Sequence, residues 1–147
     1  MVNIYLIRHG KASSGWDTNN PKLDRIGREQ SDKIALKLSK ISKEPFDIFS
    51  SPLKRCIETA EPFSKIKNKK IKIEKRVIEI PSPIENLKKR VVWLKRVLPL
   101  TWGELISDEE SKKSKIDYFL WRDNILKFFL SLNLSLIHIS EPTRLSA

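Results

Sequence analysis

Residues 2–11 read VNIYLIRHGK, and this stretch decides the fold class. Its first six residues form a compact apolar run rich in β-branched side chains, which is typical of a strand buried in a sheet. Arg8, His9 and Gly10 follow at once, so we expect the strand to open into a loop that carries His9. Open α/β sheets bind ligands at the carboxyl ends of their strands. His9 is therefore the first candidate functional residue.

Helix and strand signals alternate along the rest of the chain. Asp24 is a suitable cap for a helix over residues 25–41, in which apolar residues recur at helical spacing. Residues 46–63 read as a short strand, a turn and a helix, with Ser51 as the helix cap and Pro52 in its first turn. Isoleucine alternates with lysine over 65–80, which predicts an edge strand. Further helices are expected over 83–98 and over 116–132, and the apolar side of the first includes Val91 and Leu98. This alternation of strands and helices predicts a layered α/β domain.

Length and composition allow one globular domain and favour anionic partners. The chain has 147 residues, 39% of them hydrophobic, and a formal net charge of +11. Such a charge suits a phosphorylated metabolite, a nucleic acid or an acidic membrane surface. Cys56 is the single cysteine, which excludes an intrachain disulfide and a cysteine-rich metal site. No apolar run is long enough to span a bilayer or form a signal peptide, so we expect a cytoplasmic protein and no membrane partner.

The last residues have a separate origin in our interpretation. Residues 134–144, LSLIHISEPTR, are identical to the translation of a transposase adapter used in DNA sequencing. We therefore expect residues 1–133 to be the natural domain, incomplete at its C-terminus, and residues 134–147 to be a non-native tail. His138, the second of only two histidines, then belongs to the tail rather than to a catalytic site. The apolar alternation around His138 nevertheless suits a strand that could occupy the place of a missing one.

Three motifs together carry a family resemblance. RHG at residues 8–10 is followed by LDRIGREQS at 23–31 and by SSPLKRCIETAEPF at 50–63. In this order and spacing the chain resembles the histidine phosphatase superfamily, also called the phosphoglycerate mutase-like family. The resemblance extends more loosely to VIEIPSP at 77–83. It implies a three-layer α/β/α sandwich with a mostly parallel sheet, here without its last strand and helix.

The resemblance also implies a role for each site residue. His9 would be the nucleophile that becomes phosphohistidine, while Arg8 and Arg55 would bind the transferred phosphoryl group. Glu79 matches the region in which many members carry the proton donor for the leaving group, and it could equally be an ordinary charge partner. The family's second histidine has no trustworthy match, and neither a metal nor a cofactor is implied. Thr59, one helical turn beyond Arg55, is expected to pack or hydrogen-bond locally.

Physical chemistry supports these roles independently. A neutral imidazole is a competent nucleophile at pH 7, and a covalent intermediate divides a very slow hydrolysis into two easier steps. Arginine's planar fork donates in pairs to phosphate oxygens, and Arg55 would lie near a helix N-terminus that favours anions. Glu79 must be protonated to act as an acid, and we expect burial or the substrate's negative charge to keep it so.

Three classes of function remain open from the sequence. The leading one is a phosphomonoesterase acting on a phosphorylated small molecule or a phosphoprotein. The alternative is a phosphohistidine-protein phosphatase. The family's phosphohistidine-protein phosphatases are compact, however, and tend to lack the segment that carries the proton donor. A basic nucleic-acid- or phosphate-binding module is suggested by the charge alone, and no nucleic-acid recognition motif supports specific binding. An inactive scaffold is the third class, because this chain lacks the second histidine and is expected to be poorly active.

Overall fold

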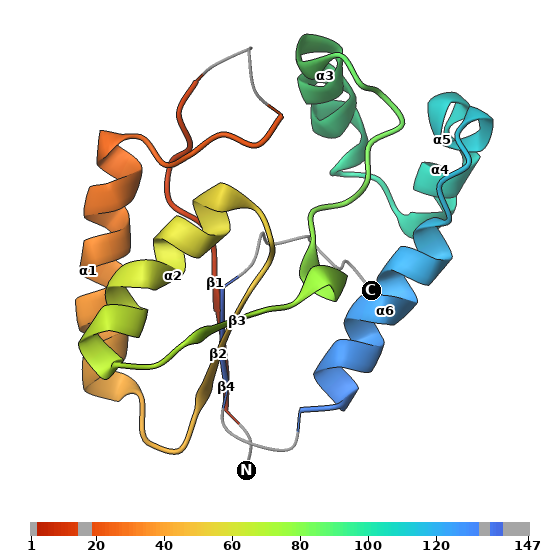
Figure 1. The fold of residues 1–147 in the computed structure, drawn as a ribbon. Helices are drawn as coiled ribbons and strands as arrows, with labels where there is room; N and C mark the ends of the chain where they lie inside the picture. Colours follow the sequence, from red (N-terminus) through yellow and green to blue (C-terminus); the bar gives the residue numbers. More distant parts are fainter. Residues whose placement is uncertain (1–2, 15–18, 133–135, 140–147) are drawn as a thin grey trace.

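The parallel sheet is the element around which the chain is arranged (Figure 1). A computed structural model describes residues 3–14 and 19–132, together with the backbone of 136–139. Its strands are β1 (Ile4–Ile7), β2 (Asp47–Ser50), β3 (Ile71–Ile73) and β4 (Leu136–Ile139). They lie in the order β1-β4-β2-β3, and every neighbouring pair is parallel. The edge strand expected over residues 65–80 is confirmed as β3, but it is only three residues long, because a helix extends to Lys67 and a short helix begins at Lys75.

The first core lies between the sheet and two helices on one of its faces. These helices are α1 (Arg25–Ile41) and α2 (Lys54–Lys67). Tyr5 and Ile7 of β1 pack against this core, whose buried members are Ala35, Leu38, Phe46, Ile48, Ala60 and Phe63. Asp24 caps α1 as predicted, because its carboxylate accepts a hydrogen bond of 2.7 Å from the Gly27 N–H. The predicted strand and helix are thus confirmed as β1 and α1. The expected burial of the strand is wrong, because β1 lies at an edge of the described sheet and its Ile4 and Leu6 side chains are exposed.

A second core lies under the helices that follow β3. They are the short η1 (Lys75–Val77), α3 (Leu87–Val97), α4 (Trp102–Ser107), α5 (Glu109–Lys113) and α6 (Tyr118–Leu130). Helix α6 covers the sheet face opposite α1 and α2, where Phe128 meets Phe49 of β2 edge-on at 5.1 Å between ring centroids (Figure 1). The buried members of this core are Ile80, Trp93, Val97, Leu105, Tyr118, Trp121 and Ile125. The fold is therefore the expected three-layer α/β/α sandwich.

Strand β4 lies inside the segment that we interpret as a non-native tail. Its backbone pairs with β1 on one side and with β2 on the other, and His138 stands opposite Leu6 and Phe49 in the register. The side chain of His138 lies outside the described residues. Backbone pairing is open to any apolar, alternating segment, so this placement does not make His138 catalytic.

Two local predictions are wrong, both because burial outweighs a local signal. Ser51 does not cap α2: the cap position is Leu53, and buried Ser51 accepts a hydrogen bond from the Leu53 N–H at 3.2 Å. On α3, Val91 is exposed although we placed it on the apolar side, and so is Leu98 at the end of this helix. Trp93 and Val97 are buried instead. None of the described helices has both the length and the apolar character to cross a membrane.

Candidate active site

The turn that carries His9 is pressed against the first turn of α1. A Cβ atom on Gly27 would lie 2.1 Å from the Lys11 carbonyl oxygen, and one on Gly10 would lie 2.5 Å from the Gly27 oxygen. The Asp24 N–H donates to the Lys11 oxygen at 2.9 Å, so the approach is held by a backbone hydrogen bond. Glycine is required on both sides of this contact because any side chain would push the two segments apart.

A short hydrogen bond orients the imidazole of His9. Its Nδ1 lies 2.6 Å from the carbonyl oxygen of Gly10. A carbonyl can only accept, so Nδ1 must carry the proton in this contact. In the neutral ring, Nε2 then bears the lone pair and is the nitrogen able to attack an electrophile.

Thr59 joins the His9 turn to α2. Its hydroxyl accepts a hydrogen bond from the buried Gly10 N–H at 3.0 Å and donates one to the Arg55 carbonyl at 2.7 Å. Ser31 of α1 in turn donates to the Thr59 carbonyl at 2.9 Å. The predicted local hydrogen bonding of Thr59 is confirmed. Through these bonds Thr59 also fixes the backbone of the His9 turn relative to that of Arg55.

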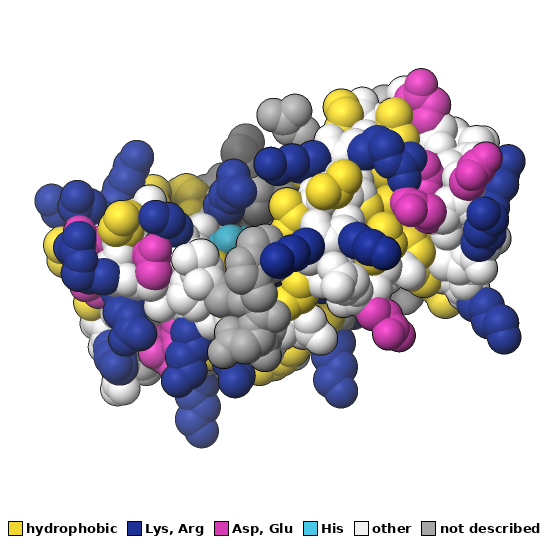
Figure 2. All heavy atoms as spheres, turned by 90° about the horizontal axis from the view of Figure 1, so that it is seen from above, with side chains coloured by type: hydrophobic (Ala, Val, Ile, Leu, Met, Phe, Trp, Pro, Cys, Tyr) yellow, Lys and Arg dark blue, Asp and Glu magenta, His cyan; other side chains and the backbone are white. Residues whose placement is uncertain are grey.

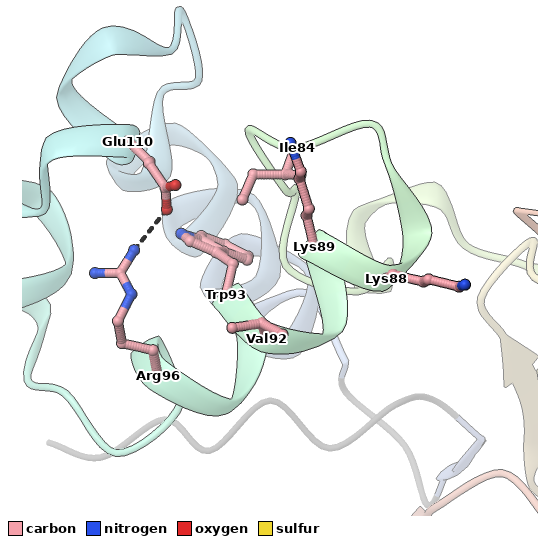
Figure 3. A pocket seen from close by; sticks show the side chains of 7 residues that line it. All are labelled: Ile84, Lys88, Lys89, Val92, Trp93, Arg96 and Glu110. Atoms are coloured by element: carbon pink, nitrogen blue, oxygen red, sulfur yellow. Dashed lines mark hydrogen bonds and ion pairs between the residues drawn. The ribbon is translucent and has the colours of Figure 1, made fainter.

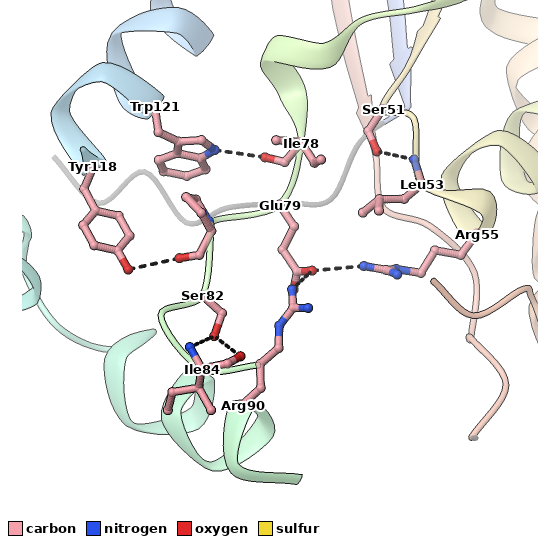
Figure 4. Close-up of polar contacts among 11 residues, drawn as sticks. Ser51, Leu53, Arg55, Ile78, Glu79, Ser82, Ile84, Arg90, Tyr118 and Trp121 are labelled. Atoms are coloured by element: carbon pink, nitrogen blue, oxygen red, sulfur yellow. Dashed lines mark hydrogen bonds and ion pairs between the residues drawn. The ribbon is translucent and has the colours of Figure 1, made fainter. Parts of the chain in front are cut away.

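Glu79 lies between two guanidinium groups (Figure 4). Its Oε2 accepts from Arg55 at 3.1 Å and from Arg90 of α3 at 2.9 Å. The side chain of Arg55 is 9% exposed, that of Glu79 22% and that of Arg90 24%. Two such contacts stabilise the ionised carboxylate. We expected burial to favour the protonated form of Glu79. In this arrangement the two arginines favour its ionised form instead.

The segment that bears Glu79 is held by α6. The Trp121 indole donates to the Ile78 carbonyl at 3.1 Å, and the Tyr118 hydroxyl donates to the Pro81 carbonyl at 3.0 Å (Figure 4). Ile80, between these two carbonyls, is buried in the second core. Glu79 is thus placed by contacts from more than thirty residues further along the chain.

The structure brings three of the four predicted site residues into one connected arrangement. His9 is linked to Arg55 through Gly10 and Thr59, and Arg55 contacts Glu79 directly. Arg8 precedes His9 at the end of β1 with an exposed side chain. Arg90 was missed in the sequence because it stands among the lysines and arginines of an amphipathic helix, and nothing in that pattern distinguishes it.

The surface around this site is basic. Figure 2 views the end of the molecule at which β1 leads to His9, and it shows a histidine with lysine and arginine side chains on either side. This distribution agrees with the net charge of +11 and would attract an anionic substrate.

Sequence comparison identifies the family. The profile of the histidine phosphatase superfamily (branch 1) matches residues 4–88, more than half of the chain. The chain belongs to this superfamily. Phosphoserine phosphatase 1 of Hydrogenobacter thermophilus is 38% identical over 88 residues, which cover 54% of this chain and 39% of that protein. The chain spans only 31% to 39% of the length of these curated relatives.

Solved structures share the fold. A phosphoserine phosphatase from Entamoeba histolytica superposes with a TM-score of 0.66 at 18% identity, covering 97% of this chain and 75% of that one. A putative alpha-ribazole-5'-P phosphatase from Escherichia coli gives a TM-score of 0.68 at 17% identity, covering 95% and 73%. These likenesses place the chain in the phosphoglycerate mutase-like fold.

Proposed function

We propose that the protein hydrolyses phosphomonoesters through a phosphohistidine on His9. The observation that carries the proposal is the chain of contacts from His9 through Gly10 and Thr59 to Arg55 and on to Glu79. It joins a nucleophile, a phosphate-binding cation and a carboxyl group within one connected network. Matches to the superfamily and to a phosphoserine phosphatase support the same reaction class.

The first step transfers the phosphoryl group to His9. Nε2 forms a bond to phosphorus as the bond from phosphorus to the ester oxygen breaks. Arg8 and Arg55 bind the equatorial oxygens, where charge is concentrated in the transition state. The ester oxygen takes a proton from an acid, for which Glu79 is the candidate, and leaves as an alcohol. Water then attacks the phosphohistidine, returns a proton to the acid and releases inorganic phosphate, which restores His9.

Substrate binding would change the environment of Glu79. A phosphoryl group competes with the carboxylate for Arg55, because both are anions that use the same donors. Once displaced toward the negative charge of the substrate, the carboxyl group binds a proton more readily. The pairing with Arg55 therefore suits Glu79 to become an acid only when substrate is present.

The alternative of a phosphohistidine-protein phosphatase has less support. The chain carries helices α3 to α5 directly after Glu79, and α3 supplies a second contact to that carboxylate. Such a segment fits a monoester substrate whose leaving alcohol needs a proton. We also retain the proposal that residues 134–147 are a non-native tail, and that this chain is a poor catalyst for lack of the second histidine.

The test uses the 147-residue chain with p-nitrophenyl phosphate and a 32P-labelled alkyl phosphate. We expect slow turnover and an acid-labile, alkali-stable label, both lost in His9→Ala and both retained in the matched control His138→Ala. Glu79→Gln should slow alkyl phosphate hydrolysis more than that of p-nitrophenyl phosphate, whose leaving group needs no proton. Turnover that survived His9→Ala would refute the mechanism. Loss of activity in a folded His138→Ala variant would contradict the prediction that His138 has no catalytic role.

A further inference from the structure

Helix α3, all of which the structure describes, turns one of its cations inward. Its basic residues are Lys88, Lys89, Arg90, Lys95 and Arg96. Arg90 is partly buried, and the other four are exposed. Trp93 and Val97 follow Arg90 at three and seven residues, hence on the same side of the helix, and both are buried. The inward position of Arg90 therefore follows from the packing of α3 on the second core.

The side chains of α3 diverge from one another. Arg96 extends to α5, where it pairs with Glu110, and Lys88 leaves the helix in a different direction (Figure 3). Arg90 turns instead to the carboxylate of Glu79 and donates to its Oε2 at 2.9 Å (Figure 4). Through Arg90, α3 thus contributes a cation to the Glu79 site.

Arg90 and Arg55 share one oxygen of Glu79. Arg55 donates to the same Oε2 at 3.1 Å. Arg55 is also joined to the His9 turn, because the Thr59 hydroxyl bonds to its carbonyl and to the Gly10 N–H. The described contacts give Arg90 no such link to this turn. An anion bound beside His9 would therefore take Arg55 from the carboxylate and leave it the contact with Arg90.

Both ends of the contact between Arg90 and Glu79 are fixed by the fold. Asn86 caps α3 by accepting a hydrogen bond of 3.1 Å from the Lys89 N–H, so the first turn that carries Arg90 is ordered. The Glu79 segment is held by the indole and phenol groups of α6 described above. An ion pair between side chains held in this way costs little further conformational entropy.

We propose that Arg90 is a positioning residue, which keeps Glu79 beside the reacting phosphoryl group after the substrate has taken Arg55. The inference rests on the proposed function, since it requires a phosphoryl group at Arg55 and a proton donor at Glu79. Without Arg90, the carboxylate would either stay with Arg55 and oppose the substrate or turn to solvent. With Arg90, it loses one of two cations, which favours protonation, and it stays in place.

Calorimetric titration with inorganic phosphate tests this role without turnover. Arg90→Met should weaken phosphate binding about fivefold, because Glu79 then competes for Arg55 with no second cation to receive it. In the Glu79→Gln background the same substitution should change the Kd by less than about twofold. Arg90→Lys keeps a charge and a donor and should remain within about twofold of the parent chain.

Lys89→Met is the matched control, because it removes the same charge from the neighbouring position. Lys89 is exposed, and the described contacts of Glu79 do not include it. We expect this variant to change the Kd of phosphate by less than about twofold. In single-turnover labelling of His9, Arg90→Met should slow transfer from an alkyl phosphate about tenfold more than transfer from p-nitrophenyl phosphate. Lys89→Met should affect the two substrates equally.

The outcomes separate this role from two others and from the proposed function. Equal weakening of phosphate binding by Arg90→Met in both Glu79 backgrounds would overturn the proposal and assign Arg90 to the phosphate itself. If Glu79→Gln acts as expected and Arg90→Met behaves like Lys89→Met, the role of Arg90 alone fails. If Glu79→Gln alters neither phosphate affinity nor the dependence on the leaving group, the acid of the proposed function fails, and the role of Arg90 with it.

Discussion

Replacing Gly27 by alanine tests how the His9 turn is held. In most helix positions this change stabilises a protein by about 0.5–1 kcal/mol, because alanine loses less backbone entropy on folding. Here the new methyl group would lie 2.1 Å from the Lys11 oxygen, and ordinary contact begins near 3.4 Å. The Lys11 backbone must therefore retreat by about 1.3 Å, away from a position held by its bond to the Asp24 N–H.

The balance of these two effects is unfavourable. Overpacking of this kind costs about 1–3 kcal/mol, which exceeds the gain in helix propensity. We expect Gly27→Ala to lower the free energy of unfolding by about 1–2 kcal/mol and to reduce phosphorylation of His9 by misplacing its turn.

Gly103→Ala is the matched control for this experiment. Gly103 lies in α4, and a Cβ atom there would meet nothing within 4 Å. We expect this variant to be stabilised by about 0.5 kcal/mol, with His9 labelling unchanged. Urea unfolding followed by circular dichroism measures both variants. Equal stabilisation of the two would refute the close packing of the His9 turn on α1.

Three further predictions concern the contacts around the site. Thr59→Val leaves the buried Gly10 N–H without its acceptor and should lower the free energy of unfolding by about 1–3 kcal/mol. Thr59→Ser keeps a hydroxyl acceptor, so it should largely retain the free energy of unfolding in the same urea titration. The pKa of Asp24 is lowered below its ordinary value, chiefly by the hydrogen bond from the Gly27 N–H. Ionised Asp24 therefore stabilises the fold at pH values above its unfolded-state pKa. This stabilisation is lost as the pH falls below about 4. Asp24→Asn should flatten this acid dependence of unfolding, and an unchanged slope would contradict the assignment. Glu79→Gln should tighten binding of inorganic phosphate, measured by calorimetry, about tenfold, because Arg55 loses a competing anion; weaker binding would show that Glu79 does not compete for Arg55.

Local signals in the sequence were sufficient for the elements around His9. The apolar run before RHG predicts β1, Asp24 predicts the start of α1, and the alternation of isoleucine with lysine predicts the edge strand β3. Each of these signals acts over a few residues, through side-chain period or a single cap. The same reasoning failed at Ser51, since the burial of that side chain depends on distant elements.

Contacts between distant elements were decided only by the tertiary structure. Trp121 and Tyr118 of α6 hold the Glu79 segment, and Arg90 of α3 contacts its carboxylate. No spacing in the sequence indicates these pairings, because they follow from how two hydrophobic cores pack on a shared sheet. The sequence by itself determined the order of the motifs, and it predicts His9 as the nucleophile and Arg8 and Arg55 as the cations near it. The tertiary structure decided which charges meet, since that depends on burial and distance across the fold rather than on separation along the chain.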